Sequence, residues 1–133
     1  MEKPIMNDLE VAPDSVVRQA AQDFAQTLGA SPAYQAFAQA DDRLIQDMAA
    51  QSAFQAYQAK TQSLRAMQML NAISPEEQAE WERLRDELLA QPTMIAYNRA
   101  QAELMAMCQE IGDRISPQIG LDYASACSTS GCC

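Results

Sequence analysis

Apolar residues recur at spacings of three and four along most of this 133-residue chain, and that periodicity is the strongest constraint on its fold. Val17, Ala20, Phe24 and Leu28 are the first such group. This spacing puts side chains on one face of an α-helix, whereas a strand would need alternation. Ala, Gln, Leu, Met and Glu dominate the composition, and they lose little side-chain freedom in a helix. We therefore expect an all-α fold.

Capping residues indicate where the first helices begin and end. A first helix should begin at Asp14 or Ser15, whose side-chain oxygens can cap free N–H groups, and should end at Gly29. Ser31 before Pro32 predicts a second start, because proline suits the first helical position.

The apolar face of the second helix passes through Phe37 and Leu44 to Met48, weakens over residues 49–52 and resumes at Phe54. No Gly or Pro forces a break in this stretch. One long helix and two helices with a kink both satisfy the pattern.

The segment "SPEEQAEWERLRDELLAQP" has the clearest helix signals. Ser74 and Glu77 form a capping box, and Pro75 takes the first helical position. The apolar face consists of Trp81, Leu84 and Leu88, and Pro92 ends the element. The outer face is acidic, with Glu76, Glu80, Glu82 and Asp86. A charged face of this kind is either simply solvated or a docking patch.

A last helix is predicted from near Pro92 to about Ser116. Two series within it repeat every seven residues, namely Tyr97, Leu104 and Ile111, and beside them Gln101, Cys108 and Ile115. Such spacing favours nearly parallel helix packing of the bundle kind. We therefore expect Cys108 on the packing seam, as a small buried hydrophobe.

A weak internal repeat relates two parts of the chain. Aligning "SPAYQAFAQADDRL" with "QPTMIAYNRAQAEL" superposes Pro32 on Pro92 and Phe37 on Tyr97. Amphipathic helices of similar composition can also align this well by chance. The pattern as a whole predicts a multi-helix hairpin bundle of about five helices, with a flexible N-terminus at 1–12, a helical domain at 13–120 and a flexible cysteine-bearing tail at 121–133.

Net charge and hydropathy restrict the partners. The net charge of −9 argues against general binding to the phosphate backbone of nucleic acid. A role in RNA or DNA biology would therefore depend on a protein partner. No stretch has the length and apolar character of a membrane span, and the first residues lack the layout of a secretory signal. We expect a cytoplasmic protein.

Catalytic motifs are scarce, because the chain contains no histidine. Asp41 and Asp42 are adjacent and diverge on a helix, while Glu103 and Glu110 lack the histidine partners of di-iron bundles. No Gly-rich phosphate loop is present. We expect no enzyme activity.

Three of the four cysteines lie in the segment "CSTSGCC", at Cys127, Cys132 and Cys133. Thiolates suit iron–sulfur clusters and zinc, but this spacing supplies three ligands, with Cys108 or a neighbouring chain as the source of a fourth. The spacing matches no common zinc or ferredoxin motif. A disordered or incidentally oxidised tail fits it as well as a metal site does.

Two residue types are candidates for protein contacts. The methionines either fill irregular gaps in the core or line a groove that can accommodate partners of different shape. Among them are Met67, Met69, Met94, Met105 and Met107. Arginine is enriched at interface hot spots, so the candidates on outer faces are Arg43, Arg65, Arg99 and Arg114, each of which is otherwise a single solvated charge.

The order of these segments resembles the YlbF/YmcA family of small helical bacterial regulators. The resemblance runs through "SPAYQAFAQADDRL", "AFQAYQAKTQSL" and the long stretch from Ile73 to Tyr123, which closes on "IGLDY". It implies an all-α hairpin bundle that self-associates and acts without catalysis. The middle helix departs from the family, because "QSAFQAY" stands where many members have an acidic or Pro-containing break.

The resemblance also implies a function. Members of the family join a complex that supports competence, sporulation and biofilm formation and directs ribonuclease Y toward particular transcripts. That complex is associated with iron–sulfur clusters held by cysteines, a role that Cys127, Cys132 and Cys133 would carry here, and Cys108 less well. The leading hypothesis is a regulatory adaptor, and the alternative is a metal-binding or redox module in which the C-terminal cysteines carry the function.

Overall fold

A computed structural model describes residues 13–123 and 125, and this part of the chain is built from helices. The five helices, in chain order, are α1 (Asp14–Gly29), α2 (Pro32–Gln46), α3 (Met48–Met69), α4 (Pro75–Leu89) and α5 (Pro92–Ile119). The all-α prediction is confirmed. The first helix has the predicted bounds, and the last continues to Ile119, three residues past the predicted Ser116.

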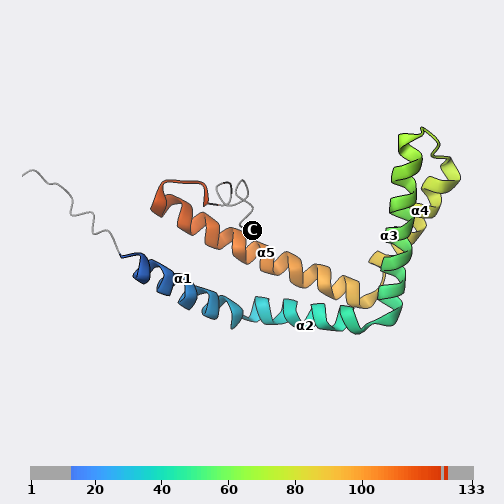
Figure 1. The fold of residues 1–133 in the computed structure, drawn as a ribbon. Coiled ribbons are helices and arrows are strands. Elements are labelled where there is room, and N and C mark those ends of the chain that lie inside the picture. Colours follow the sequence, from blue (N-terminus) through green and yellow to red (C-terminus); the bar gives the residue numbers. More distant parts are fainter. Residues whose placement is uncertain (1–12, 124, 126–133) are drawn as a thin grey trace, which may run out of the picture.

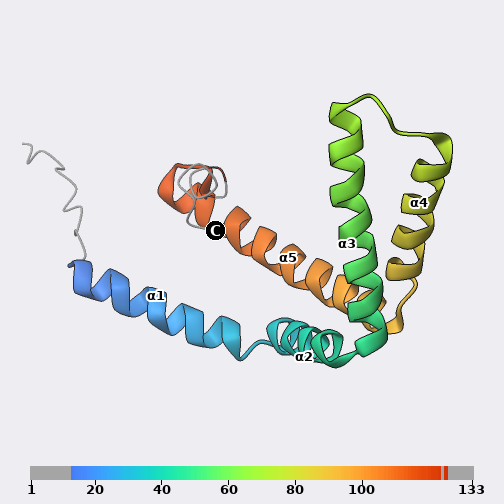
Figure 2. The same ribbon diagram turned by 45° about the vertical axis from the view of Figure 1, so that its right-hand side comes forward.

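The helices form two arms (Figure 1). In the first arm α2 and α5 lie side by side and run in opposite directions, with α1 extending beyond α2. In the second arm α3 and α4 form a hairpin that rises steeply from the other end of α2 and α5. Figure 2 shows that α1 lies far from this hairpin.

Small residues bring α2 and α5 close together. Ala40 and Ala100 are both 7 % exposed, and the rings of Phe37 and Tyr97 pack beside them with centroids 5.4 Å apart. The tilted geometry of the two rings is one of the favourable aromatic arrangements. The part-buried positions of α5 continue at Leu104 and then at Met107 and Ile111, so the predicted seven-residue series does face the packing side.

Cys108 was expected on this seam, and that prediction is wrong. Its thiol is exposed, because the seam runs through Leu104, Met107 and Ile111, and Cys108 lies about 100° around the helix from Met107. Gln101, seven residues earlier, is exposed as well.

The break between α2 and α3 answers the question that periodicity left open, because the chain bends at Asp47. This residue is extended (φ −82°, ψ 100°), and its carboxylate accepts hydrogen bonds from the N–H groups of Ala49 and Ala50. An Asp in this position is a strong N-cap. The side-chain amide of Gln51 donates back to the Leu44 carbonyl at 2.9 Å, which satisfies a group at the end of α2.

Asp47 also holds the beginning of α5. The Thr93 hydroxyl donates to the second carboxylate oxygen at 2.7 Å, across 46 positions of sequence. These hydrogen bonds, that from Thr93 most of all, stabilise the charged form and lower the pKa of Asp47 below its ordinary value of 3.8. One carboxylate therefore joins three helices.

The α3–α4 hairpin has its own small core. Leu64 of α3 and Leu88 of α4 are 8 % and 6 % exposed. The turn between the helices contains Asn71, whose φ of 51° is a left-handed conformation that Asn tolerates. Gly120 ends α5 in the same region of backbone space, at φ 68°.

Two of the predicted helix caps form differently. Pro13 occupies the N-cap of α1, where no side chain caps the helix, so neither Asp14 nor Ser15 has the predicted capping position. In the capping box of α4 the Ser74 hydroxyl accepts from the Glu77 N–H at 3.2 Å, but the Glu77 carboxylate pairs with Lys60 on α3. The Glu77 carboxylate therefore forms an ion pair with another helix instead of bonding the N-cap backbone of its own helix.

The corners at Ala30 and Ala90 have nearly the same backbone, sixty residues apart. Ala30 (φ −88°, ψ −4°) and Ala90 (φ −84°, ψ −10°) cap α1 and α4, and the next residues are extended in both cases. At each corner, the N–H of the alanine donates to the carbonyl four residues earlier, and the N–H of the next residue donates to the carbonyl three residues earlier. The internal repeat therefore includes this corner: α1–α2 and α4–α5 are joined in the same way.

We predict that Asp47→Ala lowers the midpoint of thermal unfolding at neutral pH, because it removes the cap of α3 and the acceptor for Thr93. Since folding depresses the pKa of Asp47, this stabilisation is complete above pH 3.8 and is lost as the pH falls toward the folded-state pKa. The difference between variant and wild type should therefore shrink below pH 3.8. Circular dichroism melts over a pH series measure it.

The control is Asp42→Ala, which removes an exposed carboxylate from α2 five residues away. It should not lower the midpoint at neutral pH. A difference between Asp47→Ala and wild type that stays constant from pH 7 down to pH 3 would contradict the assigned role of the carboxylate.

Candidate interaction surface

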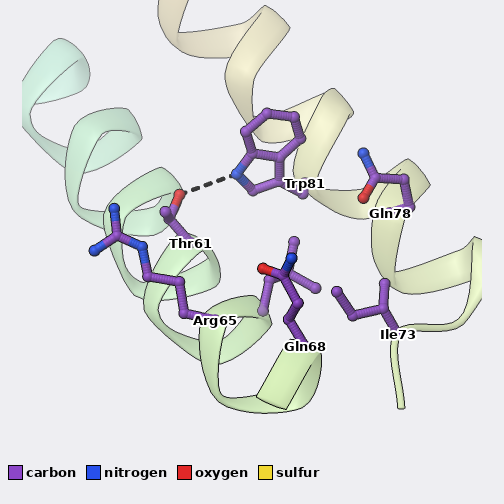
Figure 3. Close-up of a pocket in the computed structure, with 7 residues that line it drawn as sticks. Thr61, Arg65, Gln68, Ile73, Gln78 and Trp81 are labelled. Atoms are coloured by element: carbon purple, nitrogen blue, oxygen red, sulfur yellow. Dashed lines mark hydrogen bonds between the residues drawn. The ribbon is translucent and has the colours of Figure 1, made fainter. Parts of the chain in front are cut away.

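A groove runs between α3 and α4 in the upper part of the hairpin (Figure 3). Its volume is about 270 Å³, and it is open to solvent along one side. Both helices and the turn between them line it, through Thr61, Leu64, Arg65, Gln68, Ile73, Gln78 and Trp81. The mixture of an apolar floor with amide and guanidinium groups on the rim suits contact with another protein.

Trp81 holds the two walls of the groove together. Its indole N–H donates to the Thr61 hydroxyl at 3.0 Å, which Figure 3 shows, and its ring packs on Tyr57 of α3 with centroids 5.7 Å apart. The Arg85 guanidinium lies 5.4 Å from the Trp81 ring centroid. The sequence places Trp81 on the apolar face but does not predict its contacts with Thr61 and Tyr57, which lie 20 and 24 residues earlier in the chain.

Two of the four carboxylates on the acidic face of α4, Glu80 and Asp86, are engaged in local ion pairs. Arg83 pairs with Glu80 at 2.7 Å and also with Glu87, and Arg85 pairs with Asp86 at 3.1 Å. The hydrogen bond from Arg83 lowers the pKa of Glu80, and the two carboxylates raise the pKa of Arg83. Exposed pairs of this type contribute little to stability. This favours the solvated interpretation of the face over an acidic docking patch.

The elbow where α2, α3 and α5 meet contains a second cleft, of about 280 Å³. It is lined by Asp41, Leu44, Ile45, Ala50, Gln51, Phe54, Met94 and Tyr97. Three large apolar side chains at this elbow are exposed, namely Ile45 at 61 %, Met48 at 81 % and Phe54 at 43 %. We call these three residues the elbow patch.

The methionines and arginines singled out by sequence have mixed positions. Met94 lines the elbow cleft, whereas Met69 and Met105 are largely exposed. The four candidate arginines are all exposed: Arg43, Arg65, Arg99 and Arg114. Arg114 is paired with Glu110 on its own helix, and Arg65 lines the hairpin groove. The groove thus includes one of the four predicted interface arginines.

The cysteine prediction falls largely outside the described residues. Cys127, Cys132 and Cys133 are not among them. Cys108 is exposed on α5. Within residues 13–123 and 125, no three His, Cys, Asp or Glu side chains lie close enough to hold a metal ion.

One known sequence family matches most of the chain. The family described as "Control of competence regulator ComK, YlbF/YmcA" matches residues 17–119. The chain belongs to the YlbF/YmcA family. The matched region runs from the first turn of α1 to the last residue of α5, so the resemblance noted from the motifs covers all five helices.

Other comparisons add little to this assignment. No curated protein and no solved structure matches the chain significantly. Among the described helices, none is both long and apolar enough to cross a membrane. The regulatory character of this YlbF/YmcA protein therefore rests on the family, and its surface must be interpreted from its own residues.

We predict that the Trp81–Thr61 hydrogen bond couples the two walls of the groove. Trp81→Phe and Thr61→Val should each lower the free energy of unfolding, and the double variant should show a coupling energy of about 1 kcal/mol. Urea unfolding followed by circular dichroism measures all members of the cycle.

Thr27→Val provides the matched control, because Thr27 is exposed on α1 and its hydroxyl bonds only the backbone of its own helix. Its coupling energy with Trp81→Phe should be close to zero. Equal coupling energies in the two cycles would argue against the Trp81–Thr61 bond as the link between α3 and α4.

Proposed function

We propose that this YlbF/YmcA protein is a cytoplasmic, non-enzymatic regulatory adaptor that acts by binding itself and other proteins. In this proposal it takes part in the control of competence, sporulation and biofilm formation by directing ribonuclease Y to particular transcripts. The observation that carries the proposal is the elbow patch, in which Ile45, Met48 and Phe54 remain exposed beside a well-packed helix junction. Large exposed apolar side chains beside a cleft are typical of protein contact sites.

The wider surface supports the same interpretation. Sixteen large apolar side chains of the described residues are exposed, whereas the buried apolar residues are two leucines and three alanines. The groups with displaced pKa values, Asp47, Glu80 and Arg83, have structural partners rather than a shared cleft. Together with the lack of histidine, this favours binding over catalysis.

An iron–sulfur cluster is the second part of the proposal. Cys127, Cys132 and Cys133 would supply three thiolates, the donor type that such clusters prefer. The Cys108 thiol is exposed on α5, so it is accessible as a fourth ligand, and a sulfur from a neighbouring chain is the other source.

The alternative function is a metal-binding or redox module in which the cysteines act and the helices serve as a scaffold. Its support is the concentration of thiols in one short segment of a chain with few other chemically active groups. The two functions differ in what the elbow patch does, because a scaffold would not need those side chains exposed.

We predict that Ile45→Glu/Met48→Glu abolishes co-purification with ribonuclease Y and lets its regulated transcripts accumulate unprocessed several-fold in cells. Two carboxylates at the elbow patch would have to be desolvated in any contact there. Affinity purification and transcript mapping measure the effect in a strain whose own gene is deleted. Wild-type chain should restore processing.

Gln46→Glu/Gln55→Glu is the matched control, since it adds the same charges to exposed positions of α2 and α3. It should behave as wild type. If deletion of the gene leaves ribonuclease Y processing unchanged, the adaptor proposal is wrong. If processing fails in the deletion strain but both double variants restore it, the contact site lies elsewhere.

We predict that the anaerobically purified chain contains iron and acid-labile sulfide, and that Cys127→Ser/Cys132→Ser/Cys133→Ser loses both. Cys108→Ser distinguishes the sources of the fourth ligand, because it lowers iron content only if the ligand is internal. Iron and sulfide analysis beside the visible spectrum measures this, and a colourless, metal-free preparation after co-expression with its partners would contradict cluster binding.

A further inference from the structure

Helix α1 is the one helix of the five that buries none of its residues. Four apolar positions form one face of it, at Val17, Ala21, Phe24 and Leu28, and we call this face the α1 seam. Val17 is 56 % exposed and Phe24 48 %. The main contacts of α1 are with α2, its neighbour along the chain, and Figure 2 shows it extending away from the hairpin.

The internal repeat shows what such a face does when a partner helix is present. Sixty residues after the α1 seam, the corresponding positions of α4 are Glu77, Trp81, Leu84 and Leu88. These are the positions that pack α4 on α3, through the Lys60–Glu77 ion pair, the Trp81–Thr61 bond and the burial of Leu88. The α1 seam therefore has the register of a helix-packing face, without a second helix on it.

The corner after α1 keeps the seam away from the rest of its own chain. The Ser31 hydroxyl donates to the Leu28 carbonyl at 2.6 Å, and the Gln35 amide donates to the Gly29 carbonyl at 2.7 Å. The backbone at Ala30 and Ser31 repeats that of the packed α4–α5 corner. None of the other described helices buries the seam, so the helix of a second molecule can cover it.

The seam is complementary to itself. Its spacings are four, three and four, which read the same in both directions. Two copies of α1 placed antiparallel about a two-fold axis therefore bring Val17 opposite Leu28 and Ala21 opposite Phe24 of the second copy. Each small side chain faces a large one, and both contacts occur twice, as an isologous interface requires.

The charges beside the seam permit the same arrangement. Its flanks carry Ala20, Ala25 and Thr27, together with the charged residues Asp14 and Arg18, which lie four residues apart on one side. In the antiparallel register Arg18 lies opposite position 27 of the second copy, so the two Arg18 side chains are about 13 Å apart along the axis, beyond the Debye length at physiological salt. Asp23 is on the outer side and accepts from Gln19 of its own helix.

We propose that α1 is a dimerisation helix: the α1 seams of two copies of this chain pair antiparallel across a two-fold axis. This proposal rests on the self-association that is part of the proposed function, and it assigns that self-association to the α1 seam. It leaves the elbow patch and the hairpin groove of both copies free for other proteins. The dimer therefore presents two identical adaptor arms.

The test uses full-length variants and sedimentation equilibrium. Ala21→Glu/Phe24→Glu places like charges opposite one another at the two-fold axis and should weaken the wild-type dimer at least about 100-fold. Ala21→Lys/Phe24→Lys should do the same. An equimolar mixture of the two variants should restore a dimer, because each Glu then faces a Lys of the other chain.

The control is Ser15→Glu/Gln22→Glu, which adds the same charge to exposed positions of α1 that point away from the seam. It should dimerise as wild type does, and circular dichroism should show unchanged helix content in all variants because the seam buries nothing in the single chain. A dimer that survives Ala21→Glu/Phe24→Glu would overturn the α1 interface while leaving self-association intact. A wild-type chain that is monomeric at all concentrations would overturn both.

Discussion

The carboxylate of Asp47 determines how the two arms meet. It caps α3 through Ala49 and Ala50 and accepts the Thr93 hydroxyl from the first turn of α5. Because α2 ends at the same residue, the bend between the arms and the start of the long helix depend on a single side chain. The elbow patch lies at this bend, with Ile45 and Met48 on either side of Asp47, and its side chains are exposed.

The molecule packs its helices in pairs rather than around one core. Ala40 and Ala100 are buried in one arm, and Leu64 and Leu88 are buried in the other. Paired helices bury one face each, so their other faces retain exposed apolar side chains. This arrangement leaves apolar surface exposed in the isolated chain, which is what the proposed role in binding other proteins needs.

Much of the fold could be predicted from local sequence, and the candidate surface largely could not. Pro32, Pro75 and Pro92 predicted three of the helix starts, because proline at the first helical position and a preceding extended residue are local effects. The bend at Asp47 was left open although an Asp before a run of good helix formers is a capping signal. Cys108 was misplaced because a seven-residue series identifies two neighbouring faces without saying which one is covered.

The sequence by itself determined that the chain is helical, where most helices begin and end, and which family it belongs to. These properties depend on residues close together in the chain and on the order of the segments. Only the tertiary structure decided that Glu77 pairs with Lys60 rather than completing its capping box, that Trp81 bonds Thr61, and that α1 buries none of its residues against the other described helices. Each of these depends on how two distant helices lie relative to one another, and one-dimensional spacing does not contain that orientation.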